Sequence, residues 1–150
     1  MKRILFAAVL TLVAGCATKP PTTTDLLLGT WNCESKPSFG TIKGTTTYSS
    51  GGEAAGRLTI AGSGGPMAVE ATGDIDASWK LLEDDAKLEQ TIDGIKITSA
   101  KLNGQDIEPG MAQSMLAPMI AGQSATSAIK IDKTSLVLTS TDGAVTTCTR

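Results

Sequence analysis

The chain has 150 residues and a formal net charge of −2, and its residues are 41% hydrophobic but only 3% aromatic. It contains no histidine, which excludes Ser-His-Asp and Cys-His catalysis and removes the commonest metal-binding side chain. Thirteen basic residues against fifteen acidic ones leave no basic excess for binding nucleic acid. We therefore expect no catalytic residues, no metal or other cofactor, and no nucleic-acid partner.

The first residues have the composition of an export signal. Lys2 and Arg3 precede an apolar run, Ile4–Val13, that is much shorter than the roughly twenty residues needed to span a bilayer. The next residues complete Val13-Ala14-Gly15-Cys16, which resembles the lipobox of bacterial lipoproteins. In that class the cysteine receives a diacylglycerol and becomes the first residue after cleavage. The resemblance implies a signal peptide over residues 1–15; the alternative is a secreted protein with an unrelated cysteine after its signal.

The lipobox resemblance also implies a location. In enterobacteria-like lipoproteins an aspartate directly after the lipidated cysteine favours inner-membrane retention, and here that residue is Ala17. We therefore expect an outer-membrane protein that faces the periplasm and contacts the membrane through its lipid on Cys16. Residues 16–25, which contain two prolines, are predicted to form a short extended tether. Residues 26–150 are enough for one domain.

Alternation of apolar and polar residues dominates this domain. Between Met67 and Leu81 every odd position is apolar or glycine and nearly every even one is polar, which predicts a long half-buried strand with a bend or bulge at Gly73. Further strands are expected at residues 42–48, 58–60, 87–92, 95–102, 129–131 and 136–138. Turn signals separate the strands at Ser49–Gly52, Gly62–Pro66, Glu83–Asp85, Asp93-Gly94, Asn103-Gly104 and Asp142-Gly143. This pattern is typical of an all-β antiparallel sandwich or barrel.

One segment, at residues 109–121, breaks the strand pattern. Pro109 suits the first turn of a helix and Gly122 suits a C-terminal cap. Pro118 is expected to break or kink the helix because it lacks a backbone N–H. We predict one short helix, from Pro109 to Ala117, followed by a further turn.

Three methionines on this helix have two interpretations. Met111, Met115 and Met119 are four residues apart, so they share one helical face. Methionine is flexible and occurs at adaptable apolar binding surfaces. The preferred interpretation is that the three side chains plug one end of a barrel, and the alternative is that they contact a ligand or form a lid over it.

Two cysteines remain once Cys16 carries a lipid. Export to an oxidising compartment predicts a disulfide between Cys33 and Cys148, which would stabilise the domain by roughly 4–5 kcal/mol in the chain-entropy model. A redox pair would instead need neighbouring thiols in a C-x-x-C setting. If the first and last strands are antiparallel with the cysteines opposite each other, Trp31 also lies opposite Arg150 and both pairs share one face.

The hairpin before Cys148 also has two interpretations. With Asp142-Gly143 as a two-residue loop, Val137 lies opposite Cys148. With Thr141-Asp142-Gly143 as a three-residue loop, the glycine takes the left-handed conformation and Leu136 lies opposite Cys148. We prefer the second because it places leucines and the cysteine on one buried face.

The first predicted strand carries a family resemblance. Leu28-Gly29-Thr30-Trp31 resembles the G-x-W signature of lipocalins and lipocalin-like domains, in which a basic residue near the last strand packs over the tryptophan and closes the barrel. Arg150 occupies the matching place. The resemblance implies a small up-and-down barrel of about eight strands over residues 26–150, and a small apolar ligand. The chain departs from the family in its shorter length, its few aromatic residues, and a helix that precedes the last strands.

Two functions from different classes follow. The first is a non-enzymatic binding or envelope-maintenance lipoprotein whose barrel holds a small apolar molecule. The alternative is a periplasmic inhibitor of lysozyme-type enzymes, because Ala61–Met67 is similar to the Ser-Gly-rich loop of such inhibitors, although the tyrosine that follows there is missing. A carboxylate-pair enzyme would need Asp74 and Asp76, but these are expected on the solvated face of a strand.

Overall fold

The structure, a computed structural model, describes residues 19–38, 40–64 and 67–150. The predicted signal peptide and Cys16 lie outside these residues. The described chain forms two helices, α1 (Thr23–Leu27) and α2 (Pro109–Ile120), and the strands β1 (Gly29–Ser35), β2 (Gly40–Tyr48), β3 (Glu53–Gly64), β4 (Met67–Leu82), β5 (Lys87–Leu102), β6 (Gln105–Ile107), β7 (Ser124–Ile131), β8 (Ser135–Ser140) and β9 (Val145–Thr149).

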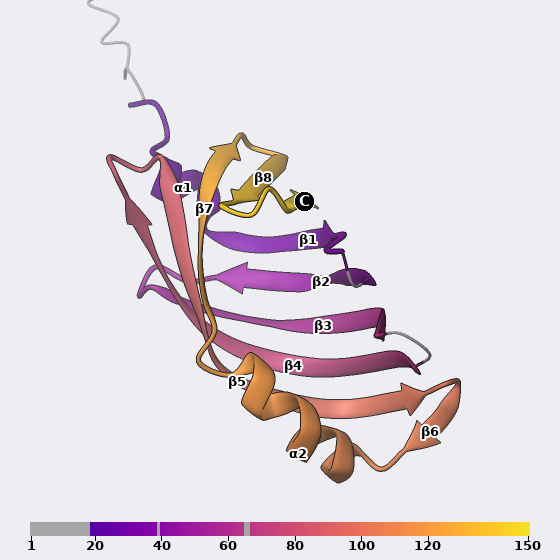
Figure 1. Ribbon diagram of the computed structural model, residues 1–150. Helices are drawn as coiled ribbons and strands as arrows, with labels where there is room; N and C mark the ends of the chain where they lie inside the picture. Colours follow the sequence, from indigo (N-terminus) through magenta and orange to yellow (C-terminus); the bar gives the residue numbers. More distant parts are fainter. Residues whose placement is uncertain (1–18, 39, 65–66) are drawn as a thin grey trace, which may run out of the picture.

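Eight of these strands close into an antiparallel barrel (Figure 1). They are neighbours in chain order from β1 to β5 and then through β7, β8 and β9, and β9 pairs with β1 to complete the ring. The short strand β6 forms a hairpin with the far end of β5 and stands outside the ring. The predicted fold class, an all-β up-and-down barrel with a short helix before its last strands, is confirmed.

β5 is one continuous strand, so the turn predicted at Asp93-Gly94 is wrong. Asp93 is an extra residue at a shift in the register with β4, which makes it a β-bulge. Because side chains alternate with a period of two, the extra residue moves the inward face from even positions such as Ile92 to odd positions such as Ile95. A second shift lies beside Gly73 of β4, where the extra residue is Thr98 of β5, so the irregularity predicted at Gly73 is a bulge of the partner strand.

One end of the barrel is filled by large side chains. The five largest that are fully buried all belong to one cluster at this end, which we call the closed end: Leu27, Trp31, Leu88, Leu136 and Cys148. These side chains come from α1, β1, β5, β8 and β9, so the cluster ties together strands from both halves of the chain.

Helix α1 begins at Thr23, so the tether does not extend to Asp25 as predicted. Thr22 caps the helix by accepting a 3.1 Å hydrogen bond from the backbone N–H of Asp25, and the Asp25 carboxylate accepts one of 2.9 Å from the N–H of Thr22. The Thr22 hydroxyl donates a further hydrogen bond of 2.8 Å to this carboxylate, and the two bonds that the carboxylate accepts lower the pKa of the Asp25 carboxyl. The helix delivers Leu27 to the closed end, where the indole N–H of Trp31 donates to the Leu27 carbonyl at 2.8 Å.

Arg150 joins three segments at the closed end. Its guanidinium carbon lies 4.2 Å from the centroid of the Trp31 ring, as the register argument predicts. Its nitrogens also donate to backbone carbonyls of Lys133, Leu28 and Leu26, at 2.8, 2.7 and 2.9 Å. The side chain therefore holds the end of α1 and the β7–β8 turn against the last strand.

Gly29 makes room for this arrangement. Its φ of +108° lies in the region that L side chains rarely adopt. A Cβ at this position would lie 3.3 Å from Nη1 of Arg150. Glycine is therefore favoured at position 29 for two reasons: the backbone conformation there, and the close approach of the Arg150 guanidinium.

The predicted disulfide is present. Cys33 and Cys148 are direct partners on β1 and β9, with 4.0 Å between their Cα atoms. Leu136 of β8 lies opposite Cys148, and Gly143 has a φ of +85°. The three-residue hairpin loop and its register are therefore also confirmed.

Replacing Arg150 tests the closure. Arg150→Ala should lower the free energy of unfolding by about 1–3 kcal/mol, because it removes charged hydrogen-bond donors and a cation over an indole. Thermal unfolding followed by circular dichroism measures this, and Lys133→Ala is the control because its backbone carbonyl stays. Trp31 emission, measured in a Trp79→Phe background, should shift with Arg150→Ala alone. Equal losses in the two variants would contradict the closing role of the guanidinium.

Candidate ligand-binding cavity

The end of the barrel opposite α1 opens into a cavity of about 910 Å³. Its lining includes three solvent-exposed residues: Ser63 near the end of β3, Met119 on α2, and Asp142 in the turn between β8 and β9. Solvent therefore enters from this end, which we call the mouth. Pockets for small organic ligands commonly measure about 300–1,000 Å³, so this one is large enough to enclose such a molecule.

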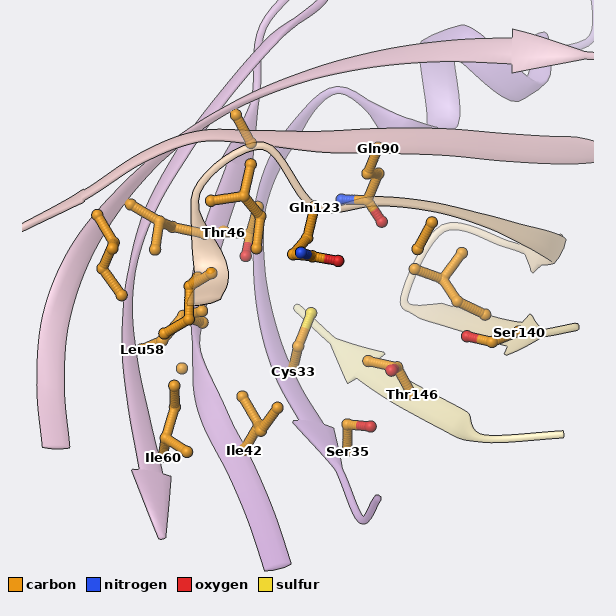
Figure 2. A pocket seen from close by; sticks show the side chains of 18 of the residues that line it. Cys33, Ser35, Ile42, Thr46, Leu58, Ile60, Gln90, Gln123, Ser140 and Thr146 are labelled. Atoms are coloured by element: carbon orange, nitrogen blue, oxygen red, sulfur yellow. The ribbon is translucent and has the colours of Figure 1, made fainter. Parts of the chain in front are cut away.

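Branched apolar side chains cover one side of the cavity. Figure 2 shows Ile42 of β2 beside Leu58 and Ile60 of β3 on this side. β4, β5 and α2 extend the surface. We call it the aliphatic wall: Ile42, Leu58, Ile60, Val69, Ile75, Ile92, Ile95, Leu116 and Ile120. It has no aromatic member, so it fits a flexible hydrocarbon chain better than it fits a stacked ring.

Small hydroxyl side chains cover the opposite side. Ser127, Ser140, Thr146 and Ser35 come from β7, β8, β9 and β1, which are consecutive neighbours in the barrel. We call these four residues the hydroxyl wall, and Figure 2 shows Ser140 and Thr146 across from Leu58 and Ile60, with Ser35 beside Ile42. Ser127 and Ser140 are cross-strand partners with 3.3 Å between their hydroxyl oxygens, and Ser35 is the partner of Thr146.

The hydroxyl wall results from a change along each strand. Inward positions near the closed end are large or apolar, and the next inward position toward the mouth carries a hydroxyl. Leu138 precedes Ser140 on β8, Ser127 precedes Ile129 on β7, and Thr146 precedes Cys148 on β9. This change can be read from the sequence only when the register of the strands is known, because the register decides which serines and threonines face inward.

The floor of the cavity is polar but uncharged. Gln90 donates a 2.9 Å hydrogen bond from its amide to the Tyr48 hydroxyl, and the Tyr48 ring packs edge-on against Trp79 with 6.1 Å between centroids. Burial raises the pKa of Tyr48 from 10.0 to about 12, although the hydrogen bond from Gln90 opposes the shift. Tyr48 therefore stays neutral at physiological pH, and the stability that its neutral form contributes is lost only as pH rises from 10 toward 12.

Helix α2 is fastened to β5 by one side chain. The Gln113 amide accepts from the backbone N–H of Ile97 and donates to the carbonyl of Ile95, both at 2.7 Å. β5 pairs with β7 only over Lys87–Thr91, so β7 does not cover the edge of β5 at Ile95 and Ile97. The glutamine supplies hydrogen-bond partners for two backbone groups of that edge. Neither the methionine spacing nor the flanking prolines drew attention to Gln113 in the sequence.

The methionines do not plug the barrel. Met111, Met115 and Met119 are 60%, 58% and 70% exposed, and of these Met119 alone lines the cavity. The inward face of α2 is instead formed by smaller or branched residues: Ala112, Leu116, Ala117 and Ile120. The predicted break at Pro118 is also wrong, because the helix continues to Ile120. Only the last turn follows Pro118, so the missing N–H affects little of the helix.

Asp74 and Asp76 lie on the outer, solvated face of β4, as the sequence predicted, and not in the cavity. Asp74 pairs with Arg57 at 2.8 Å on the outer face, which lowers the pKa of the carboxyl, and Asp76 is exposed. Within the described residues, no cluster of metal-ligating side chains is present, and neither helix is long and apolar enough to cross a membrane. The centre of the Ser-Gly-rich loop, residues 65–66, lies outside the part of the chain that the structure describes.

Comparisons with known proteins add no functional assignment. No family model matches this chain, and no curated protein matches its sequence. The eight-stranded antiparallel barrel is consistent with a lipocalin-like barrel.

Removing the Gln113 amide should loosen α2 without unfolding the barrel. In Gln113→Ala the N–H of Ile97 and the carbonyl of Ile95 lose their partner, at a local cost of about 1–3 kcal/mol. Hydrogen–deuterium exchange should show faster exchange at Ile97 and throughout α2, with β1–β4 unchanged. The matched control is Ser114→Ala, one residue away on the exposed side of the helix. Unchanged exchange in Gln113→Ala would contradict the fastening role.

Proposed function

We propose that this chain is a lipid-anchored envelope protein whose barrel binds a small apolar molecule without catalysing a reaction. The observation that carries the proposal is the cavity of about 910 Å³ with the aliphatic wall on one side. A preformed apolar pocket with a few polar groups is the usual form of a small-molecule site. The Gly29-Thr30-Trp31 run and Arg150 support assignment of the barrel to the lipocalin-like type.

The anchor part of the proposal rests on the first residues. Val13-Ala14-Gly15-Cys16 follows a cationic start and a short apolar run, as in bacterial lipoproteins. Ala17 favours the outer membrane, with the domain on the periplasmic side. Lipoprotein-type modification adds more than one acyl chain, which gives stable attachment where a single chain gives marginal binding.

The position of α1 supports a particular orientation of the barrel relative to the membrane. The chain enters the barrel through α1 (Figure 1), which lies at the closed end, and the cavity opens at the other end. A lipid on Cys16 would therefore hold the closed end toward the membrane. The mouth would face away from the anchor, where ligands in the periplasm reach it.

Filling the cavity tests the binding function. Ile60→Trp adds bulk to the aliphatic wall, whereas Ala61→Trp adds the same group on the exposed outer face of β3. We expect the apolar dye N-phenyl-1-naphthylamine to bind the wild-type chain and Ala61→Trp with similar affinity, and Ile60→Trp at least about tenfold more weakly, a difference of about 1.4 kcal/mol. Titration followed by dye fluorescence measures this. Equal binding by both variants would place the dye outside the barrel.

Replacing the predicted lipid site tests the anchor. Cys16→Ser should move the protein from the membrane fraction to the soluble periplasmic fraction, because the acyl chains are lost. Fractionation with immunoblotting measures the distribution, and labelling with radioactive palmitate measures acylation. The control is Ala17→Ser, which keeps the cysteine. Incorporation of palmitate into Cys16→Ser would show that Cys16 is not the acylated residue.

A further inference from the structure

The cavity offers hydrogen bonds but almost no charge. Its polar lining consists of hydroxyl and amide side chains: Ser35, Thr46, Tyr48, Ser63, Gln90, Gln123, Ser124, Ser127, Ser140 and Thr146. Of the lining residues that the structure describes, Asp142 alone is charged. Asp142 lies in the loop at the mouth, where its carboxylate accepts a 3.1 Å hydrogen bond from the N–H of Ala144.

The described part of this lining has no basic side chain, and this determines which polar group a ligand can carry. A carboxylate or phosphate loses its hydration on entering an apolar cavity and needs a paired cation or several charge-assisted hydrogen bonds in return. The hydroxyl wall supplies neutral hydrogen bonds only, and Asp142 would repel an anion at the mouth. A hydroxyl, an amide or an ester carbonyl meets no such cost, because a neutral hydrogen bond compensates it.

Most of the branched apolar side chains lie on one side of the barrel and the four residues of the hydroxyl wall on the other, with Leu138 of β8 and Thr46 of β2 as exceptions. The aliphatic wall is built from β2–β5 and α2, and the hydroxyl wall from β7–β9 and β1 (Figure 2). At the same height near the mouth, Ile42 of β2 is the direct neighbour of Ser35 of β1, so the boundary between the surfaces falls between these strands. A ligand that is polar on one part and hydrocarbon on the other therefore matches both surfaces.

The hydroxyl wall has free hydrogen-bonding capacity. Ser127 and Ser140 contact each other, and each hydroxyl has further acceptor capacity. Among the described residues, the structure records no side-chain hydrogen bond for Thr146 or for Gln123, and Figure 2 shows the Gln123 amide projecting into the cavity. These groups gain a partner only from a ligand or from water.

We propose that the ligand of this cavity is an uncharged amphiphile with a flexible hydrocarbon chain, such as a fatty alcohol, a monoacylglycerol or a fatty amide. The proposal rests on the proposed function and names its ligand class. The chain lies on the aliphatic wall, and the neutral polar group is hydrogen-bonded by Ser127, Ser140 and Thr146.

Competition between matched ligands tests the class. The probes are 1-decanol, decanoate and decylammonium, each titrated at pH 8 against dye bound to the full chain carrying Cys16→Ser, so that no acyl group competes. We expect 1-decanol to displace the dye at least about tenfold more effectively than either ion, since each tenfold corresponds to about 1.4 kcal/mol. Failure of all three, and of the dye, would overturn the proposed function itself.

Selective loss of hydroxyls tests the polar contact. The triple variant Ser127→Ala/Ser140→Ala/Thr146→Val keeps the shape of the wall, and we expect its affinity for 1-decanol to fall about five- to tenfold while dye binding and the melting temperature stay as in the wild type. The control variant, Thr139→Val/Thr147→Val, changes outward-facing hydroxyls on β8 and β9. It should bind 1-decanol as the wild type does.

The outcomes separate the two proposals. If the dye binds but decanoate displaces it as well as 1-decanol does, the cavity binds apolar chains and the inference about charge is wrong. If decylammonium is the best competitor and Asp142→Asn removes that preference, the site selects cations through its mouth and the inference is also overturned. If the triple variant binds 1-decanol as tightly as the wild type, the polar group of the ligand is not held by the hydroxyl wall.

Discussion

The pairing of β1 with β9 is the constraint on which the rest of the structure depends. It closes the sheet into a barrel, so that the facing edges of β1 and β9 are paired with each other. Because side chains alternate, its register decides which residues face inward. With Cys33 opposite Cys148, Trp31 enters the closed end beneath Arg150, and Ser35 and Thr146 face the cavity. A slip of one residue would exchange the inner and outer faces of one of the two strands, and would remove that strand's side chains from both the closed end and the hydroxyl wall.

The same register divides the barrel along its axis. Near α1 the inward side chains are large, and Trp31 and Leu136 are fully buried. Toward the mouth the inward positions carry serine, threonine or glycine on several strands, and such small side chains cannot meet in the middle of a ring of eight strands. Gly44 is the direct neighbour of Cys33 on β2, and a Cβ there would lie 2.1 Å from the carbonyl oxygen of Arg57. The cavity thus follows from side-chain size in one half of the barrel.

Sequence patterns predicted the parts of the fold that depend on local alternation or on one long-range bond. The strand over Met67–Leu81 and the bridge from Cys33 to Cys148 are of this kind. The pattern misled at Asp93-Gly94, because a bulge and a turn produce the same break in alternation. It could not identify Gln113, whose partners are backbone atoms of a strand edge that the sequence alone does not expose. The cavity was unpredictable for a similar reason, since its volume depends on how the strands meet.

Helix α2 is the element whose attachment most directly affects the ligand site. A strand in its place would pair with β5 through a ladder of backbone hydrogen bonds, whereas α2 uses two from the Gln113 amide and the burial of a few side chains. Local stability follows the number of such contacts, so α2 separates from the barrel more easily than a barrel strand does. Yet α2 contributes Leu116 and Ile120 to the aliphatic wall. A ligand that contacts these residues binds the barrel more tightly when the helix is docked, so it stabilises the docking by the difference in its binding free energy between the docked and undocked states. If the cavity binds an apolar chain as proposed, that binding and the docking of α2 form one linked equilibrium.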